Sequence, residues 1–287
     1  MTITPDAVRV FAPAKINLFL HVGDKRADGF HALQSLVVFV GAGDELTFEL
    51  ADGISLVLEG LFAGVLSADT DNLVLKAARA LASRSACEQG ARITLTKNLP
   101  VASGIGGGSA DAAAALRGLA RLWDLDVSQD LLHEIGAILG SDIPVCIASV
   151  PAWMEGRGET VTAVNVPGAA MVLVNPGVAV PTGKVFAALK ERRGVGMPLP
   201  PIMKSVPELI AYLKTTTNDL EAPAREIAPV IGDVLNAFAA QQGVMLARMS
   251  GSGATCFALF ESDAAANNAA AKISKQNPGW WVAATAA

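Results

Sequence analysis

Four glycines within five residues, followed by a serine and a run of alanines, form the most unusual segment of this chain. The segment reads LPVASGIGGGSADAAAAL from Leu99 to Leu116. A loop without side chains lets an anion approach the main-chain N–H groups, and a helix that begins there adds the positive end of its dipole. We therefore interpret the segment as a phosphate-binding loop, in which the Ser109 hydroxyl bonds a phosphate oxygen or a magnesium ion. A tight strand-to-helix turn without a ligand is the alternative.

Two better-known phosphate loops do not fit this segment. A Walker A loop needs Lys and then Ser or Thr after its last glycine, and GIGGGSA has no lysine. The dinucleotide fingerprint needs a third glycine at the position that Ser109 occupies. The loop therefore indicates phosphate binding of a different kind.

Three further features carry possible chemistry, and each has an ordinary alternative. Lys15 heads the apolar segment APAKINLFL, although lysine is usually an exposed residue. Asp142, in GSDIPVCI, lies between a predicted helix end and a predicted apolar strand, where a cap or turn role is equally compatible. A second glycine-rich segment, RMSGSGATCF from Arg248, lies between two predicted strands, where a hairpin is the usual structure.

Short β-rich runs and amphipathic helices must position these residues. In the first third of the chain, period-two patterns predict strands over residues 8–22, 33–40, 44–50 and 54–59. Helices are predicted over residues 72–86, after the glycine-rich segment, and after a cap at Ser128. In the second half, strands and helices alternate irregularly, which favours an α+β fold over a regular βαβ sheet. A loop is predicted from Gly194 to Glu208. We place a domain boundary so that residues 1–153 and 154–287 form two domains.

Composition excludes several classes of protein. The chain has 287 residues, of which 52% are hydrophobic, so intrinsic disorder is excluded. No apolar run approaches the ~18 residues of a membrane helix, and the first residues lack the pattern of a secretory signal. Cys87, Cys146 and Cys256 are predicted to be buried, reduced thiols, and a formal charge of −5 without a basic block argues against nucleic acid. We expect a cytoplasmic protein.

The combination of segments is more specific than any one of them. The order PAKINLFL, LPVASGIGGGSADAA, GSDIP, SGSGATCF resembles the GHMP family of small-molecule kinases, named for galactokinase, homoserine kinase, mevalonate kinase and phosphomevalonate kinase. The segments RADGFHALQSL and NPGVAVPTGKVF resemble the branch whose acceptor is carried on a cytidine diphosphate in the non-mevalonate isoprenoid pathway. The resemblance implies a ribosomal-S5-like ATP domain, a ferredoxin-like second domain and a site in the cleft between them.

The resemblance also implies roles for individual residues. Asp142 is the expected general base and Lys15 the catalytic cation, in a transfer of phosphate from ATP, bound with Mg²⁺, to the 2-hydroxyl of the acceptor. The residues expected to bind ATP are Asn72, Lys97, Pro100, Gly104, Gly106, Gly107, Gly108, Ser109 and Ala110. Those expected to bind the acceptor are Asn17, Phe30, His31, Thr182 and Phe186, with the two phenylalanines around the cytosine ring and His31 at its edge.

Alternatives remain open at several of these positions. Helix capping explains Asn72 equally well, and a structural polar contact explains Asn17. The relatives carry Gly-Tyr-His where this chain has Gly29-Phe30-His31, so a bond from a tyrosine hydroxyl is lost. A GHMP kinase for another small alcohol, resembling mevalonate or homoserine, is the second hypothesis, and a non-catalytic nucleotide-binding protein is the third. Either a monomer or a homodimer is compatible with the sequence.

Overall fold

The computed structural model describes residues 7–69 and 71–287, which form two compact units. Residues 1–6, which begin the segment that lacks a secretory pattern, lie outside the described residues. Unit 1 comprises the described residues of Met1–Ala14, Gly43–Val101 and Gly106–Ser149, and unit 2 comprises Lys15–Ala42, Ala102–Ile105 and Val150–Ala287. Each unit is thus assembled from three separate stretches of chain. The predicted domain boundary at residues 153 and 154 stays a prediction.

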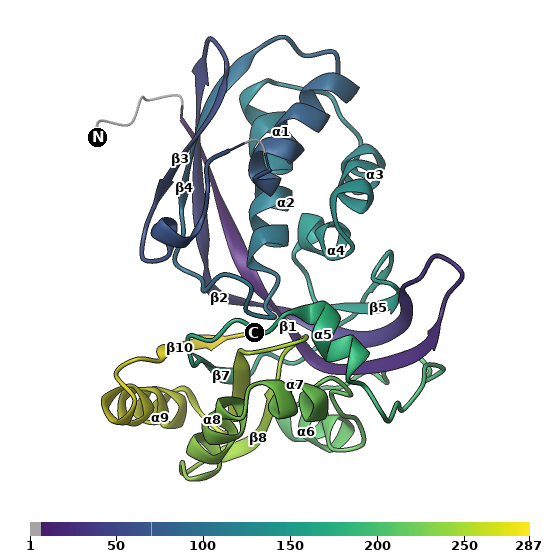
Figure 1. Cartoon of the computed structure of the whole chain (residues 1–287), viewed down its shortest axis with the longest axis vertical. Helices are drawn as coiled ribbons and strands as arrows, with labels where there is room; N and C mark the ends of the chain where they lie inside the picture. The colour runs from purple at the N-terminus through teal and green to yellow at the C-terminus, as the bar shows by residue number, and fades with distance from the viewer. Residues whose placement is uncertain (1–6, 70) are drawn as a thin grey trace. The chain divides into compact units, whose positions relative to one another are not determined.

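Unit 1 is a small sheet with helices beside it. Strand β3 (Ile54–Glu59) runs parallel to β4 (Gly90–Thr96), and helix α1 (Leu73–Arg84) connects them after the short helix η1 (Ala63–Val65). The later part of β2 (His31–Ala51) pairs with β4 in antiparallel register, and β1 (Val8–Lys25) pairs with β2. Figure 1 shows α1 and α2 next to these strands. The remaining helices of the unit are α2 (Gly107–Leu122), α3 (Gln129–Leu139) and α4 (Ile143–Ala148).

Small residues allow α2 to pack closely in unit 1. The side chains of residues 112–115, all alanines, are completely buried on this helix. A Cβ atom at Gly118 would lie only 2.1 Å from Cε2 of Phe48, a fully buried residue of β2. The alanine-rich composition of α2 is therefore a packing requirement, since larger side chains would push the helix away from the sheet.

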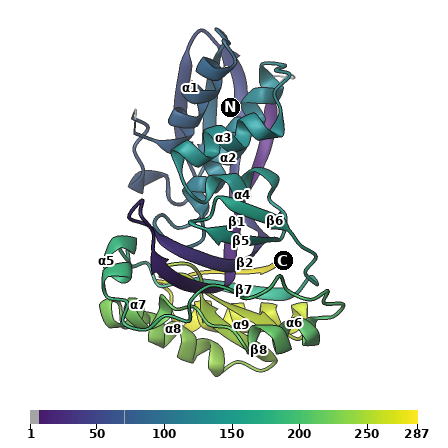
Figure 2. The ribbon, with the colours of Figure 1, turned by 90° about the vertical axis from the view of Figure 1, so that its right-hand side faces the viewer.

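Unit 2 contains a four-stranded antiparallel sheet in the order β10-β7-β9-β8. Its strands are β7 (Ala170–Asn175), β8 (Val244–Met249), β9 (Cys256–Phe260) and β10 (Trp281–Ala286). Between β7 and β8 lie α5 (Thr182–Ala187), α6 (Val206–Leu213), α7 (Glu221–Ile227) and α8 (Val230–Ala239), and α9 (Asp263–Gln276) precedes β10. Both views show α8 and α9 next to the strands of this sheet (Figures 1 and 2). This connectivity is the ferredoxin-like motif, as predicted.

A second group of strands in unit 2 contains part of the segment RADGFHALQSL, residues 26–36. Leu33–Val37 of β2 pairs with β5 (Ala152–Gly156), and β5 pairs with β6 (Thr160–Ala163), both in antiparallel register. The tip between β1 and β2 therefore lies beside the tip between β5 and β6. An ion pair of 2.8 Å between Arg26 Nη1 and Glu159 Oε1 joins the two tips.

The α+β prediction is confirmed, and some details of the predicted elements are wrong. Residues 33–40 and 44–50 belong to one strand, β2, rather than two. The apolar segment after Asp142 is the helix α4, not a strand, because Pro144 in its first turn fixes a helical φ angle. The predicted loop over residues 194–208 ends earlier, since α6 begins at Val206 after a cap by Ser205.

The cysteines and the helices bear on two expectations drawn from composition. Cys146 and Cys256 are buried as predicted, whereas Cys87 is only partly buried, so the prediction for Cys87 was wrong. Within residues 7–69 and 71–287, none of the helices combines the length and hydropathy that a membrane span requires.

Candidate active site

The first turn of α2 presents backbone N–H groups that no side chain caps. The cap position is Gly106, in the left-handed conformation with φ 65°, and the first turn contains no acidic residue. By contrast, α1 and α3 are capped by the side chains of Asn72 and Ser128. The unpaired donors at the start of a helix, together with its dipole, form a site for an anion.

The glycines here are required for different reasons. We call residues 98–106, between β4 and α2, the glycine loop. A Cβ atom at Gly104 (φ +77°) would lie 2.5 Å from the carbonyl oxygen of Ser250, so this glycine is required by close backbone packing. At Gly108, which is exposed, a Cβ atom would meet only Leu73 Cδ1 at an ordinary 3.7 Å. The protein itself therefore does not require a glycine at 108, and the open space there suits a ligand.

The middle of the glycine loop is held by backbone hydrogen bonds within unit 2. The N–H of Lys15 donates to the carbonyl oxygen of Ile105 at 2.9 Å, and the N–H of Thr255 donates to that of Ser103 at 3.0 Å. The buried hydroxyl of Ser250 donates to the Gly104 carbonyl oxygen at 3.0 Å. The segment around Ser250 connects β8 to β9, as expected of a hairpin, and it also supports the glycine loop.

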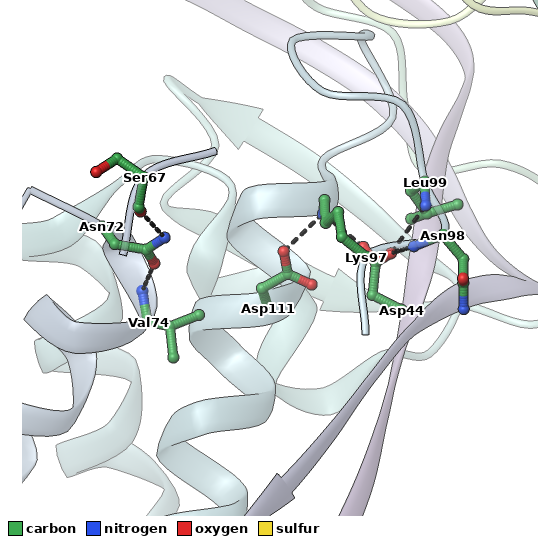
Figure 3. A network of polar contacts seen from close by, with 8 residues as sticks. All are labelled: Asp44, Ser67, Asn72, Val74, Lys97, Asn98, Leu99 and Asp111. Carbon is green, nitrogen blue, oxygen red and sulfur yellow. Dashed lines mark hydrogen bonds and ion pairs between the residues drawn. The ribbon is translucent and has the colours of Figure 1, made fainter. Parts of the chain in front are cut away.

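A buried ion network lies at the base of the glycine loop in unit 1 (Figure 3). The Lys97 ammonium contacts Asp44 Oδ2 at 2.5 Å and Asp111 Oδ2 at 2.6 Å. The other Asp44 oxygen accepts the N–H groups of Asn98 at 2.6 Å and Leu99 at 2.8 Å. Each of the three ionisable residues is at most 3% exposed. Lys97 is thus engaged inside the protein, and its predicted contact with the nucleotide stays a prediction.

The network contains two acids and one base, and burial together with their mutual interactions shifts the pKa values of Asp111 and Lys97. Burial raises the pKa of Asp111 to about 7, and the Asp44 charge adds to this effect against the opposing influence of Lys97. Burial alone would lower the pKa of Lys97, but the two carboxylates outweigh it and raise that pKa. Among the described residues, Asp111 Oδ1 finds no hydrogen-bond partner, so full ionisation of Asp111 is poorly compensated.

Two residues predicted to bind the nucleotide have structural roles. The Asn72 side chain accepts the N–H of Val74 at 2.9 Å and donates to the Ser67 carbonyl oxygen at 2.9 Å, which confirms the capping alternative (Figure 3). Ala110 is buried, and its N–H donates to the Gly106 carbonyl oxygen at 2.8 Å. That N–H therefore belongs to the helix, so contact of Ala110 with a phosphate is not supported. Pro100 lies in the glycine loop.

The two predicted catalytic residues fall in different units. Lys15, on β1 in unit 2, is only 3% exposed. Asp142 occupies the cap position before α4 in unit 1 and is partly exposed. Within the part of the chain that the structure describes, its carboxylate makes no capping hydrogen bond to α4, which disfavours the cap interpretation.

The predicted acceptor residues gather in unit 2. The rings of His31 and Phe186 are stacked, with centroids 5.5 Å apart and planes inclined by 17°. Phe30, 51% exposed, instead has the guanidinium of Arg157 5.2 Å from its ring centroid. The structure thus pairs Phe186 with His31, and no motif in the sequence pointed to Arg157.

Two further acceptor predictions concern hydrogen-bonding side chains. The Asn17 amide donates to Ser35 Oγ at 2.8 Å, which supports the structural alternative for Asn17. Thr182, the first residue of α5, shares a hydrogen bond of 2.8 Å with the Ser252 hydroxyl. Thr182 is exposed and therefore open to a ligand.

Family models place the chain among known proteins. The model described as GHMP kinases N terminal domain matches residues 72–149, and the one described as GHMP kinases C terminal matches residues 203–279. The chain belongs to the GHMP kinase family. It is therefore an ATP-dependent kinase for a small molecule, as predicted, and has the two-domain GHMP kinase fold.

Several named relatives extend over nearly the whole chain. A protein from Cereibacter sphaeroides named 4-diphosphocytidyl-2-C-methyl-D-erythritol kinase is 52% identical, covering 95% of this GHMP kinase and 96% of the relative. A protein of the same name from Parvibaculum lavamentivorans is 48% identical, with coverage of 96% and 97%. A crystal structure of 4-(cytidine 5'-diphospho)-2C-methyl-D-erythritol kinase superposes with a TM-score of 0.78 at 30% identity, covering 97% of this chain and 98% of that one.

The raised pKa of Asp111 predicts a pH-dependent effect of Asp111→Asn. Between about pH 4 and pH 7 the folded protein holds a proton on Asp111 that the unfolded chain has released, so stability falls as pH rises through this range. The asparagine variant lacks this titration. Its free energy of unfolding, relative to the unsubstituted protein, should therefore rise by at least about 1 kcal/mol from pH 5 to pH 8.

Urea denaturation at the two pH values measures this difference. Asp52→Asn, at an exposed turn, controls for the substitution itself. A difference for Asp111→Asn that is the same at both pH values would show that Asp111 is ionised throughout, contrary to the prediction.

Proposed function

We propose that this GHMP kinase transfers the γ-phosphoryl group of ATP to the 2-hydroxyl of 4-diphosphocytidyl-2-C-methyl-D-erythritol, giving the 2-phosphate and ADP. The observation that carries the proposal is the 52% identity, over 95% of the chain, to a relative with that name. The reaction belongs to isoprenoid precursor synthesis, and the acceptor is a small molecule carried on a cytidine diphosphate. We expect a cytoplasmic enzyme, either a monomer or a homodimer.

ATP binding is assigned to the start of α2. The N–H groups of Gly107, Gly108 and Ser109 would bind phosphate oxygens, because Gly106 provides no capping side chain and Gly108 leaves open space. The adenine is assigned to the vicinity of Asn72 and Lys97, as the family pattern implies.

Mg²⁺ is expected to enter with ATP. Among the described residues, no group of three or more His, Cys, Asp or Glu side chains is arranged to hold a metal ion. Mg²⁺ commonly relies on nucleotide phosphates, waters and one or two protein oxygens, and the partly exposed Ser109 hydroxyl fits this role. When bound, the ion neutralises charge on the phosphates.

Catalysis is assigned to Asp142 and Lys15 on the family pattern. The acceptor 2-hydroxyl oxygen forms a bond to Pγ while the bond from Pγ to the β-phosphate oxygen breaks, and the hydroxyl proton passes to the Asp142 carboxylate. The Lys15 ammonium stabilises negative charge on the transferring group. Such transfers depend mainly on position and charge stabilisation, which a fixed lysine and a fixed carboxylate supply.

Cytosine recognition is assigned to the aromatic cluster in unit 2. His31 Nδ1 lies 3.1 Å from the Gly23 carbonyl oxygen, which only accepts, so a neutral imidazole carries its proton on Nδ1. Nε2 is then an acceptor, which suits the exocyclic amino group of cytosine, a hydrogen-bond donor. Phe186 and Phe30 provide flat apolar surfaces for the base, with the Arg157 cation beside Phe30.

An acceptor panel tests the proposed function. ATP consumption is measured with the cytidylyl substrate, mevalonate, homoserine and galactose, each at the same concentration. We expect turnover with the cytidylyl substrate alone. Turnover with mevalonate or homoserine but not with the cytidylyl substrate would favour a GHMP kinase for another small alcohol. Nucleotide binding without turnover of any of the four acceptors would favour a nucleotide-binding protein.

Substitution of Gly108 tests the nucleotide site without disturbing the fold. Gly108→Val places methyl groups where a phosphate must approach, while the nearest protein atom leaves room for a side chain. The dissociation constant for a non-hydrolysable ATP analogue should rise at least about tenfold, with little change in melting temperature. Gly53→Val, at an exposed turn with nothing within 4 Å of a Cβ, is the matched control. Equal affinity in both variants would contradict the assignment.

Asp142→Asn tests the general base. Removing the proton acceptor should lower kcat by about 100-fold or more, while KM for ATP changes little. Asp126→Asn, an exposed residue before α3, controls for the loss of a carboxylate. Full turnover by Asp142→Asn in steady-state assays would rule out a proton-abstracting role.

Phe186→Ala tests the cytosine site. Loss of a stacking surface should raise KM for the cytidylyl substrate by about ten- to a hundredfold and leave KM for ATP unchanged. Because Phe186 also packs against the core of unit 2, its neighbour Val185, completely buried on α5, provides a control. Val185→Ala should lower the melting temperature with little effect on either KM. An equal rise of both KM values in Phe186→Ala would mean that the site is misplaced.

A further inference from the structure

The glycine loop needs an external support in unit 1, and the buried ion network provides one. The loop begins at Asn98, two residues after the end of β4 at Thr96, and enters α2 at Gly107. Glycine gives up more conformational freedom on folding than any other residue, so a glycine-rich loop is ordered only where its ends are firmly held. The Asp44 carboxylate, on β2, touches the first of these ends directly.

Two contacts of Asp44 Oδ1 hold the start of the loop. The oxygen accepts the N–H of Asn98 at 2.6 Å and of Leu99 at 2.8 Å, and the carboxylate is completely buried. A charged acceptor strengthens such bonds, since hydrogen bonds to ionised groups are roughly twice as strong as those between neutral groups. Two consecutive peptide units are thereby fixed in orientation at the point where the loop leaves the strand.

The second oxygen extends this support to α2. Asp44 Oδ2 binds the Lys97 ammonium, which also binds Asp111 Oδ2 in the early part of α2. The ammonium lies immediately beneath the first residue of the helix, since a Cβ at Gly107 would be 3.1 Å from Nζ. The backbone of Lys97 is itself fixed, because its N–H donates to the carbonyl oxygen of Glu59 at 2.6 Å and its carbonyl oxygen accepts the N–H of Phe62 at 3.0 Å.

We infer that Asp44 is a positioning residue of the ATP site: it holds the start of the glycine loop directly and, through Lys97 and Asp111, sets the position of the first turn of α2 relative to that start. The inference rests on the proposed binding of ATP at this turn. Asp44 acts through the loop and makes no contact with the nucleotide itself. Asp44 binds the backbone of the loop, and the loss of this contact would lower the affinity for ATP.

Asp44→Ala and Asp44→Asn test this role, with Glu45→Ala as the matched control. Glu45 is the next residue of β2, carries the same charge and is exposed. We expect Asp44→Ala to raise both KM for ATP and the dissociation constant of a non-hydrolysable ATP analogue at least tenfold, with KM for the acceptor unchanged. Asp44→Asn keeps an oxygen for the two N–H groups, so its affinity for ATP should lie between those of Asp44→Ala and the unsubstituted protein. Glu45→Ala should bind ATP normally.

Measuring both KM for ATP and the melting temperature distinguishes a positioning role of Asp44 from an effect on stability alone. A purely structural Asp44 would lower the melting temperature and the active fraction, and hence the apparent kcat, but molecules that remain folded would keep their KM for ATP. That result in Asp44→Ala would overturn the inference. If Asp44→Ala does not fold, Asp44→Asn decides: it must weaken ATP binding measurably, and normal affinity would overturn the inference.

The proposed function is tested separately in the same titration. If the unsubstituted protein does not bind the ATP analogue, the proposed function fails, and the inference about Asp44 fails with it. If the unsubstituted protein binds the analogue and both Asp44 variants bind it with the same affinity as the unsubstituted protein, only the inference about Asp44 fails.

Discussion

A phosphate site made of backbone N–H groups has no side chains of its own with which to keep its shape. The glycines that admit a phosphate also make the loop flexible, so its order must come from neighbouring segments. In unit 1 the buried carboxylate of Asp44 holds the start of the glycine loop. In unit 2 the N–H of Lys15 and the hydroxyl of Ser250 hold its middle. The buried charge in unit 1 and the second glycine-rich segment in unit 2 thus serve the same requirement.

Helices and strands were predicted correctly where the local pattern of their residues matches their surroundings in the fold. The strand at residues 54–59 and the cap at Ser128 were predicted correctly, because period-two alternation and a capping serine act over a few residues. The helix α4 was predicted as a strand, since its six residues are apolar and rich in β-branched side chains. Nearly the whole of α4 is buried, so no polar face reveals a helical period. The helices α6 and α7 and the strands β5 and β6 were not predicted.

The contacts around the candidate site could be predicted only where a motif is contiguous. The glycine loop was found from the sequence, but Asp44 was not, because it lies 53 residues before Lys97 and only the fold brings them together. Asp111 did carry a signal, since an aspartate within a run of alanines on a buried helix needs either a cation nearby or a bound proton. The aromatic residues were identified by resemblance, whereas the stacking of His31 on Phe186 depends on how β2 and α5 pack.

The interleaving of the two units along the chain restricts how such an enzyme diversifies. Each unit is built from three stretches, and the long strands β1 and β2 contribute to both. No single contiguous stretch contains the whole of either unit, so genetic recombination that exchanges one stretch would replace only part of a unit. Neither unit is transferable as a cassette. New acceptor preferences must instead accumulate by point substitution in place, and exposed tips such as residues 26–30 are where the fold tolerates them best.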